Sequence, residues 1–149
     1  MHACPNCGQN AGTGLNCQYC NQLIGLAVGV RLATPARRLG GYLLDLFFLL
    51  VTAIIGWLIW SLIVWKDGLT PAKQVLGMRV IKWETGRRAG WGTMALREFV
   101  GKFLVMGVIG IIPFASIVLS FMLLWDSKRQ QLWDKIASTL VAYDPNRQL

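Results

Sequence analysis

The sequence is poor in charged residues, and acids are especially scarce. Of 149 residues only 15% are charged, and 7 Asp and Glu stand against 15 Lys and Arg. Soluble domains carry about a quarter charged residues, which keep them dispersed in water. Hydrophobic residues make up 54% of the chain. This balance excludes an ordinary soluble composition and predicts an integral membrane protein.

Histidine and catalytic motifs are also scarce. His2 is the only histidine, and the Ser and Thr residues lie in no triad-like setting. No glycine-rich phosphate loop follows a predicted strand. We therefore expect that the protein is not an enzyme.

A secretory signal peptide is not visible. The N-terminus, MHACPNCGQN, is polar, and the first long apolar run begins only near Leu39, too deep for the apolar region of a signal peptide. Because no secretory context surrounds the cysteines, a reducing cytoplasm is the expected location of the N-terminal segment.

Two long apolar runs occupy residues 39–65 and 103–125. The first contains one charge, Asp45, and would measure about 40 Å as a continuous helix, against a hydrocarbon core of about 30 Å. We expect a mainly α membrane protein with two long transmembrane helices. The first is either tilted or bent near Gly56 into a re-entrant hairpin, and the second is kinked near Pro113. A buried helical hairpin of a soluble protein is the less favoured alternative.

The polar stretches predict smaller elements. Residues 77–93 alternate apolar and polar side chains around 84–86, which predicts a short, basic β-hairpin. Residues 93–102 predict a helix that leads into the second run, and residues 127–143 predict an interfacial helix or turn followed by a short strand. The resulting division is a head at 1–24, a linker at 25–38, a membrane domain at 39–143 and a tail at 144–149.

Four cysteines form two CxxC units in the head. Two facing CxxC turns supply the tetrahedral sulfur ligands of a structural zinc site. Gly8 and Asn21 follow the second Cys of each unit, and both residue types tolerate the left-handed backbone needed there. Iron in place of zinc, or two disulfides, are the alternatives. The ligands are Cys4, Cys7, Cys17 and Cys20.

The net charge of +8 suits either an anionic membrane surface or nucleic acid. The cations flank the apolar runs, which favours attraction to anionic headgroups, worth about 1 kcal/mol per residue near the surface. Residues 1–30 contain no Lys or Arg, so nucleic-acid binding by the head is not expected. The counts of Lys and Arg do not decide on which side of the membrane residues 66–102 lie.

Asp45 is the ionisable residue inside the first run, and such a residue is a candidate for function. Arg38 lies seven positions before it on the same helical face. We expect the second membrane helix to offer Arg97 or Lys102 as a partner for Asp45, since a buried charge needs pairing. The alternative is that Asp45 lies near the interface and stays hydrated.

Four motifs, RRLGGYLLD, GLTPAKQVLGMRV, LRE and QQLWDKIASTLVAY, resemble the RDD family of bacterial membrane proteins over residues 36–143. The resemblance implies that Arg38 is the family Arg and Asp45 the Asp of the first membrane helix. Asp134 fits the remaining Asp better than Asp126 does. Lys73 belongs to the TPxK motif, in which the family has TPGK and this chain has Ala72.

The resemblance implies a multi-pass protein of the bacterial cell membrane, and transport has been proposed for family members. One hypothesis is therefore a transport module for an ion or small ligand that acts as an oligomer, because two helices rarely enclose a pathway alone. The other is a non-catalytic assembly or adaptor subunit of a larger membrane complex, docked through its zinc head. The cysteine head resembles the short zinc-ribbon heads that are common at the N-termini of bacterial membrane proteins.

Overall fold

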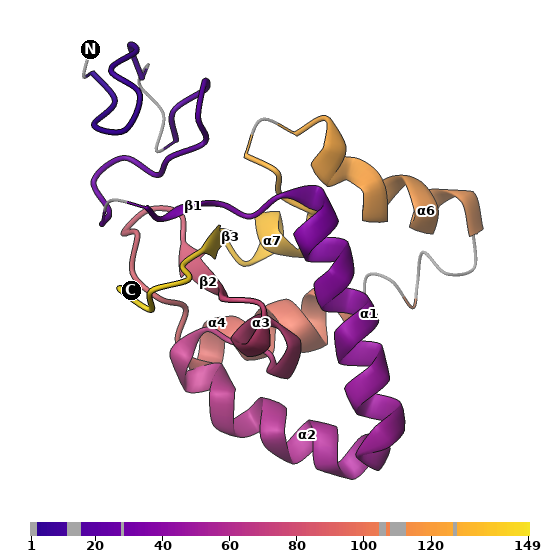
Figure 1. Cartoon of the computed structure of the whole chain (residues 1–149). Helices are drawn as coiled ribbons and strands as arrows, with labels where there is room; N and C mark the ends of the chain where they lie inside the picture. Colours follow the sequence, from indigo (N-terminus) through magenta and orange to yellow (C-terminus); the bar gives the residue numbers. More distant parts are fainter. Residues whose placement is uncertain (1–2, 12–15, 28, 105–106, 108–112, 127) are drawn as a thin grey trace.

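A computed structural model describes residues 3–11, 16–27, 29–104, 107, 113–126 and 128–149. A small sheet lies at the centre, between the N-terminal head and the helices (Figure 1). The two termini lie on the same side of the molecule, close to the head and the sheet. The arrangement places the apolar helices α1, α2 and α6 on the side away from the head.

The first apolar run forms two helices, α1 (Pro35–Val51) and α2 (Ala53–Val64), instead of one. Thr52 ends α1 by donating both its backbone N–H and its hydroxyl to the Phe48 carbonyl, at 2.9 and 2.7 Å. Ala53 then adopts a left-handed φ of 49°, a conformation that does not continue a right-handed helix. The expectation of one long helix is wrong here. The run does bend, as the re-entrant alternative predicted, but four residues before Gly56.

The second run is described in part. A π-helix, η2 (Leu96–Leu104), leads into its first residues, and α6 (Pro113–Phe121) and the 3-10 helix η3 (Met122–Leu124) lie toward its end. Pro113 begins a helix, while residues 105–106 and 108–112 lie outside the described part. Among the described residues, no helix is both long enough and apolar enough to cross a membrane. Two long transmembrane helices are therefore not confirmed.

The sheet joins distant parts of the chain. Its strands are β1 (Arg31–Leu32), β2 (Met78–Lys82) and β3 (Thr139–Tyr143), in the antiparallel order β1-β3-β2. The short strand predicted at the end of residues 127–143 is confirmed as β3. The predicted basic hairpin is correct only as a turn, because β2 pairs along its length with β3 and meets residue 88 in one isolated bridge.

Both faces of the sheet are covered. On one face Val80 and Val141 pack with Trp65 and Met94, from the short helices η1 (Trp65–Asp67) and α4 (Trp91–Ala95). On the other face Ile81, Leu140 and Ala142 pack with Leu23, Val30 and Leu32. The alternation of side chains along β2 and β3 thus attaches the head to one face and the helices to the other. Two more short helices, α3 (Pro71–Val75) and α7 (Leu132–Ile136), carry signature residues to this core.

Gly68 provides a test of this core. It ends η1 with a φ of 70°, and its carbonyl accepts the Val80 N–H at 2.8 Å. A Cβ at Gly68 would lie 2.5 Å from the Val80 carbonyl oxygen.

We expect Gly68→Ala to lower the free energy of unfolding by about 2 kcal/mol or more, measured by thermal unfolding in detergent. Gly90→Ala is the control, because no atom lies within 4 Å of its Cβ position. Equal losses for both variants would contradict the close approach at Gly68.

Candidate functional site

Asp134 lies at the centre of a buried network of charged side chains. It occupies the first turn of α7 and is fully buried. Its Oδ2 accepts the backbone N–H of Gln131 at 3.1 Å, which satisfies one of the free donors at the start of the helix. The Gln131 side chain completes this capping box. The local sequence QQLWD therefore fixes the carboxylate before any distant residue contacts it.

Two guanidinium groups converge on this carboxylate from other elements. Arg97, in η2, donates from Nε to Asp134 Oδ1 at 2.6 Å, and from Nη1 to Glu98 at 2.8 Å. Arg38, in the first turns of α1, donates from Nη2 to Asp134 Oδ2. Arg38 also donates to the Arg129 carbonyl and, at 3.3 Å, to the Gln131 side-chain oxygen. The network thus connects α1, η2 and α7.

The ion pairs keep Asp134 charged although it is buried. Burial alone would raise the pKa of this carboxyl group, because it disfavours the charged form. The guanidinium groups of Arg38 and Arg97 outweigh this effect, and the pKa of Asp134 falls well below its usual range. Both oxygens of the carboxylate accept hydrogen bonds from within the protein.

Asp45 has a different role. Its Oδ1 accepts the Ala72 backbone N–H at 3.1 Å and the Trp57 indole N–H at 3.3 Å, and its Oδ2 accepts the Thr70 hydroxyl at 2.9 Å. The carboxylate therefore caps the first turn of α3, where backbone N–H groups would otherwise lack partners. The expected pairing of Asp45 with Arg97 is wrong, because Arg97 pairs with Asp134. The side chain of Lys102 lies outside the described residues.

The TPAK motif forms the start of α3. Pro71 stands in the first turn, and the Thr70 hydroxyl accepts the Lys73 backbone N–H at 3.4 Å. Lys73 is buried, and its ammonium group donates to the same hydroxyl at 3.3 Å. Ala72 is fully buried in a helical segment and donates to Asp45. The position thus does not need glycine in this chain.

The four cysteine side chains form a separate cluster. All four sulfur atoms lie within 4.8 Å of one another, with Cys4 and Cys20 3.5 Å apart and Cys7 and Cys17 3.7 Å apart. The cysteines are free, and these separations exceed the roughly 2.05 Å of a disulfide bond. The arrangement fits one tetrahedral ion with four thiolate ligands.

The two turns of the cluster have the same backbone geometry. Gly8 and Asn21 have φ values of 70° and 58°, and each donates its N–H, at 2.9 Å, to the carbonyl of the first Cys of its unit. The predicted left-handed positions are thus confirmed. Burial opposes ionisation of Cys20, but hydrogen bonds from the Gln22 backbone and the Asn6 side chain lower its pKa to about 6. A backbone hydrogen bond from Gln9 favours ionisation of Cys7, but burial and the neighbouring thiols raise the pKa of Cys7 to about 12, so the four thiols do not ionise alike.

A comparison with known protein families matches residues 20–138 to the RDD family. The chain belongs to the RDD family. Members of this family are generally membrane-associated. No curated protein and no solved structure matches the chain significantly.

The structure brings Arg38, Asp134 and Arg97 of this RDD protein together. Asp45 accepts hydrogen bonds from the start of α3, the helix that contains Lys73. Glu98, Gln131 and Tyr42 were missed as site residues. Glu98 pairs with Arg97, and the Tyr42 hydroxyl donates to Gln131. The motifs LRE and QQLWD contain the first two, so adjacency to a signature residue was the available signal.

Removal of the charge of Asp134 tests the network. We expect Asp134→Asn to lower the free energy of unfolding by about 3–5 kcal/mol, because it leaves Arg38 buried without a counter-charge and Arg97 paired with Glu98 alone. The control is Asp67→Asn, which breaks the exposed pair with Arg88 at 3.1 Å and should cost at most about 1 kcal/mol. Denaturant unfolding in detergent measures both. Similar losses would contradict a special role of Asp134.

The lowered pKa of Asp134 predicts that the stability of the fold depends on pH. Because its pKa is lower in the folded state than the ordinary value of 3.8, its contribution to stability is complete above that value. The contribution is lost as the pH falls toward the folded-state pKa. We expect wild-type stability to decrease on acidification below about pH 4 more steeply than that of Asp134→Asn. Parallel curves would contradict the lowered pKa.

Metal analysis tests the cysteine cluster. We expect the purified protein to carry a stoichiometric metal ion and Cys17→Ser to lose it, because a structural site uses all four ligands. Gln18→Ser, between two ligands, is the control and should retain the metal. Four oxidised thiols without metal in the wild-type protein would contradict the site.

Proposed function

We propose that this RDD protein is a non-catalytic, membrane-bound assembly or adaptor module whose Arg and Asp signature holds the fold together. The observation that carries the proposal is the engagement of both signature acids by internal donors. Asp134 accepts from two arginines and the start of α7, and Asp45 accepts from the start of α3 and a Trp. Carboxylates that already accept hydrogen bonds from internal donors are better suited to a structural role than to repeated binding and release of ions.

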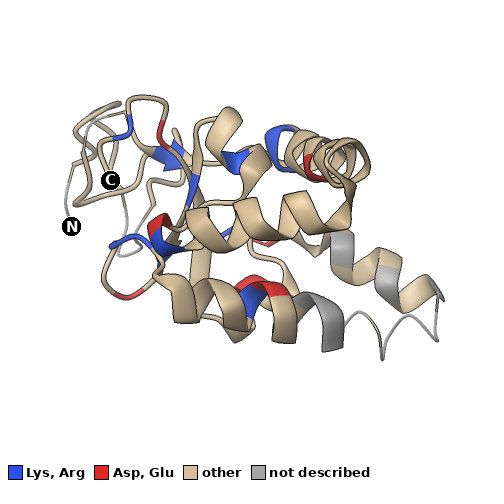
Figure 2. Ribbon diagram, turned by 90° about the horizontal axis from the view of Figure 1, so that it is seen from below, with Lys and Arg blue, Asp and Glu red and all other residues tan. Residues whose placement is uncertain are grey.

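The membrane attachment is supported by exposed apolar side chains on α1, α2 and α6. At the turn between α1 and α2, Leu50 and Ile54 are 71% and 67% exposed, and Phe114 on α6 is 80% exposed. Helix α2 contains no Lys or Arg, and most cations lie toward the side with the termini (Figure 2). We infer that the α1–α2 hairpin inserts into the membrane while the basic side faces anionic headgroups.

The docking function is assigned to the cysteine head, with zinc as the expected metal. The head is tied to the sheet through hydrogen bonds of Leu32 to Asn21 at 3.0 Å and of Leu23 to Val30 at 3.1 Å. Tyr19, between two cysteines, is 69% exposed. A fixed head with an exposed aromatic ring suits contact with a protein partner on the cytoplasmic side.

Transport by a homo-oligomer is the second candidate, and one observation favours it. Arg97 Nη2 is buried, and within the described part of the chain it has no hydrogen-bond partner. Its neighbour Glu98 lines a cavity of about 330 Å³ together with Trp57 and Phe99. Ionisable groups beside an apolar cavity are compatible with coupling to a proton or cation. Ion flux in liposomes with the purified protein would favour this candidate, whereas a stoichiometric unrelated partner would favour assembly.

Charges at the hairpin turn test the attachment. We expect the double variant Leu50→Glu and Ile54→Glu to lose resistance to carbonate extraction, because each buried carboxylate costs about 2–3 kcal/mol. The control is Ile136→Glu on α7, a position that is 42% exposed and lies outside the hairpin. Fractionation of membranes with an antibody to the chain measures the outcome. Full retention of the double variant would contradict insertion of the hairpin.

A further inference from the structure

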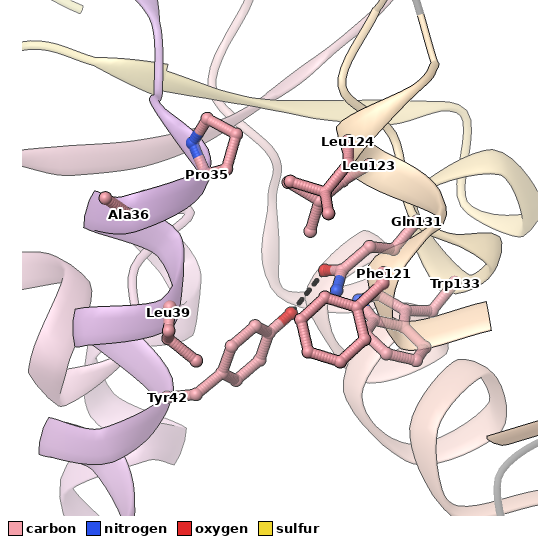
Figure 3. Close-up of a pocket in the computed structure, with 9 residues that line it drawn as sticks. All are labelled: Pro35, Ala36, Leu39, Tyr42, Phe121, Leu123, Leu124, Gln131 and Trp133. Atoms are coloured by element: carbon pink, nitrogen blue, oxygen red, sulfur yellow. Dashed lines mark hydrogen bonds between the residues drawn. The ribbon is translucent and has the colours of Figure 1, made fainter. Parts of the chain in front are cut away.

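A cavity of about 370 Å³ lies between α1 and the segment that runs from α6 to α7 (Figure 3). Leu39 and Tyr42 of α1 form one wall, and Phe121, Leu123 and Trp133 form the opposite one. None of the residues that line it is charged. Its volume is at the lower end of the range for small-ligand sites, roughly 300–1,000 Å³.

One polar group of the cavity wall lacks a partner. Trp133 is 4% exposed, and its indole Nε1 is buried without a hydrogen-bond partner among the described residues. A buried donor left in this state costs about 1–3 kcal/mol. The Tyr42 hydroxyl, by contrast, donates to the Gln131 side-chain oxygen (Figure 3). The wall of this apolar volume therefore contains two residues with neutral N–H groups, Trp133 and Gln131, and only the Trp133 indole N–H lacks a partner among the described residues.

This chemistry selects a neutral acceptor attached to an apolar chain. An anionic group inside the cavity would lack a counter-charge, because Arg38 is engaged by Asp134, Gln131 and the Arg129 carbonyl. An ester carbonyl accepts one hydrogen bond without carrying a charge. The small volume suits one hydrocarbon chain better than two.

The cavity is continuous with the apolar surface of the same helices. Leu39, Phe121 and Leu124 line it, and each is about half exposed. They belong to α1, α6 and η3, beside the surface assigned above to the membrane. A chain from the surrounding lipid would therefore contact uncharged lining residues as it enters from the side.

We propose that the cavity binds one acyl chain of a membrane phospholipid, whose ester carbonyl accepts the Trp133 indole N–H. The proposal rests on the membrane attachment of the proposed function. It assigns Trp133 to ligand binding, one residue before Asp134 and on the same short helix. A bound acyl chain would then pack against α7, the short helix that also contains Asp134.

Photo-crosslinking in lipid nanodiscs tests this site with the full chain. The probe is phosphatidylglycerol with a diazirine on one acyl chain, and mass spectrometry locates the labelled peptides. We expect label in residues 35–42 and 121–133. Leu123→Trp fills the cavity and should reduce this label about fivefold or more. Leu58→Trp, which fills the other cavity, is the matched control and should leave it unchanged.

Competition separates the hydrogen bond from the apolar contact. Unlabelled ester lipid should compete about fivefold better than its diether analogue, which lacks the carbonyl. In Trp133→Phe, which keeps a ring but removes the N–H, both lipids should compete equally. Circular dichroism and metal content show whether each variant is folded, and Trp133→Phe keeps the test valid if Leu123→Trp does not fold.

Any one of several results would overturn the proposal. They are label confined to the outer face of α1 and α2, unchanged label in folded Leu123→Trp, and equal competition by ester and ether lipid in the wild type. Label by free fatty acid, with no label by the phospholipid, would also overturn it. If the membrane attachment itself is wrong, carbonate would extract the wild-type protein. This result distinguishes that failure from failure of the lipid site.

Discussion

The carboxylate of Asp134 lies between two guanidinium groups, and the packing of the helices depends on this contact. Arg38 lies in the first turn of α1, Arg97 near the start of η2, and Asp134 in the first turn of α7. Each of these charges would be strongly unfavourable alone in the interior. The three elements must therefore meet in one arrangement, which positions the exposed apolar helices relative to the sheet.

A second capping contact extends this framework. Asp45, about two helical turns after Arg38, accepts hydrogen bonds from the start of α3 and from the Trp57 indole, so it links α1, α2 and α3. The strand β3 follows α7 directly and pairs with β2, which follows α3. The two acids thus hold different parts of one scaffold, and β1, which follows the cysteine head in the chain, forms one edge of the same sheet.

The cysteine site could be predicted from the sequence because CxxC turns are local, and the left-handed positions after them accept only a few residue types. Asp45 and Asp134 could be selected as special residues, but their partners could not be predicted. Two donors to Asp45 lie 25 and 27 positions away at the start of α3, and the third, the Trp57 indole, lies 12 positions away in α2. The reversal at Ala53 has no sequence signal, since alanine favours helices and rarely adopts a positive φ. The cavity beside Trp133 depends on tertiary packing alone.

A double-mutant cycle on Arg38 and Asp134 tests the structural role of the signature most directly. The free energies of unfolding of Arg38→Met, Asp134→Asn and the double variant would be compared with that of the wild type in the same detergent. The account predicts that the double variant is less destabilised than the sum of the single variants by roughly 2 kcal/mol. Additive effects, with a coupling near zero, would contradict it.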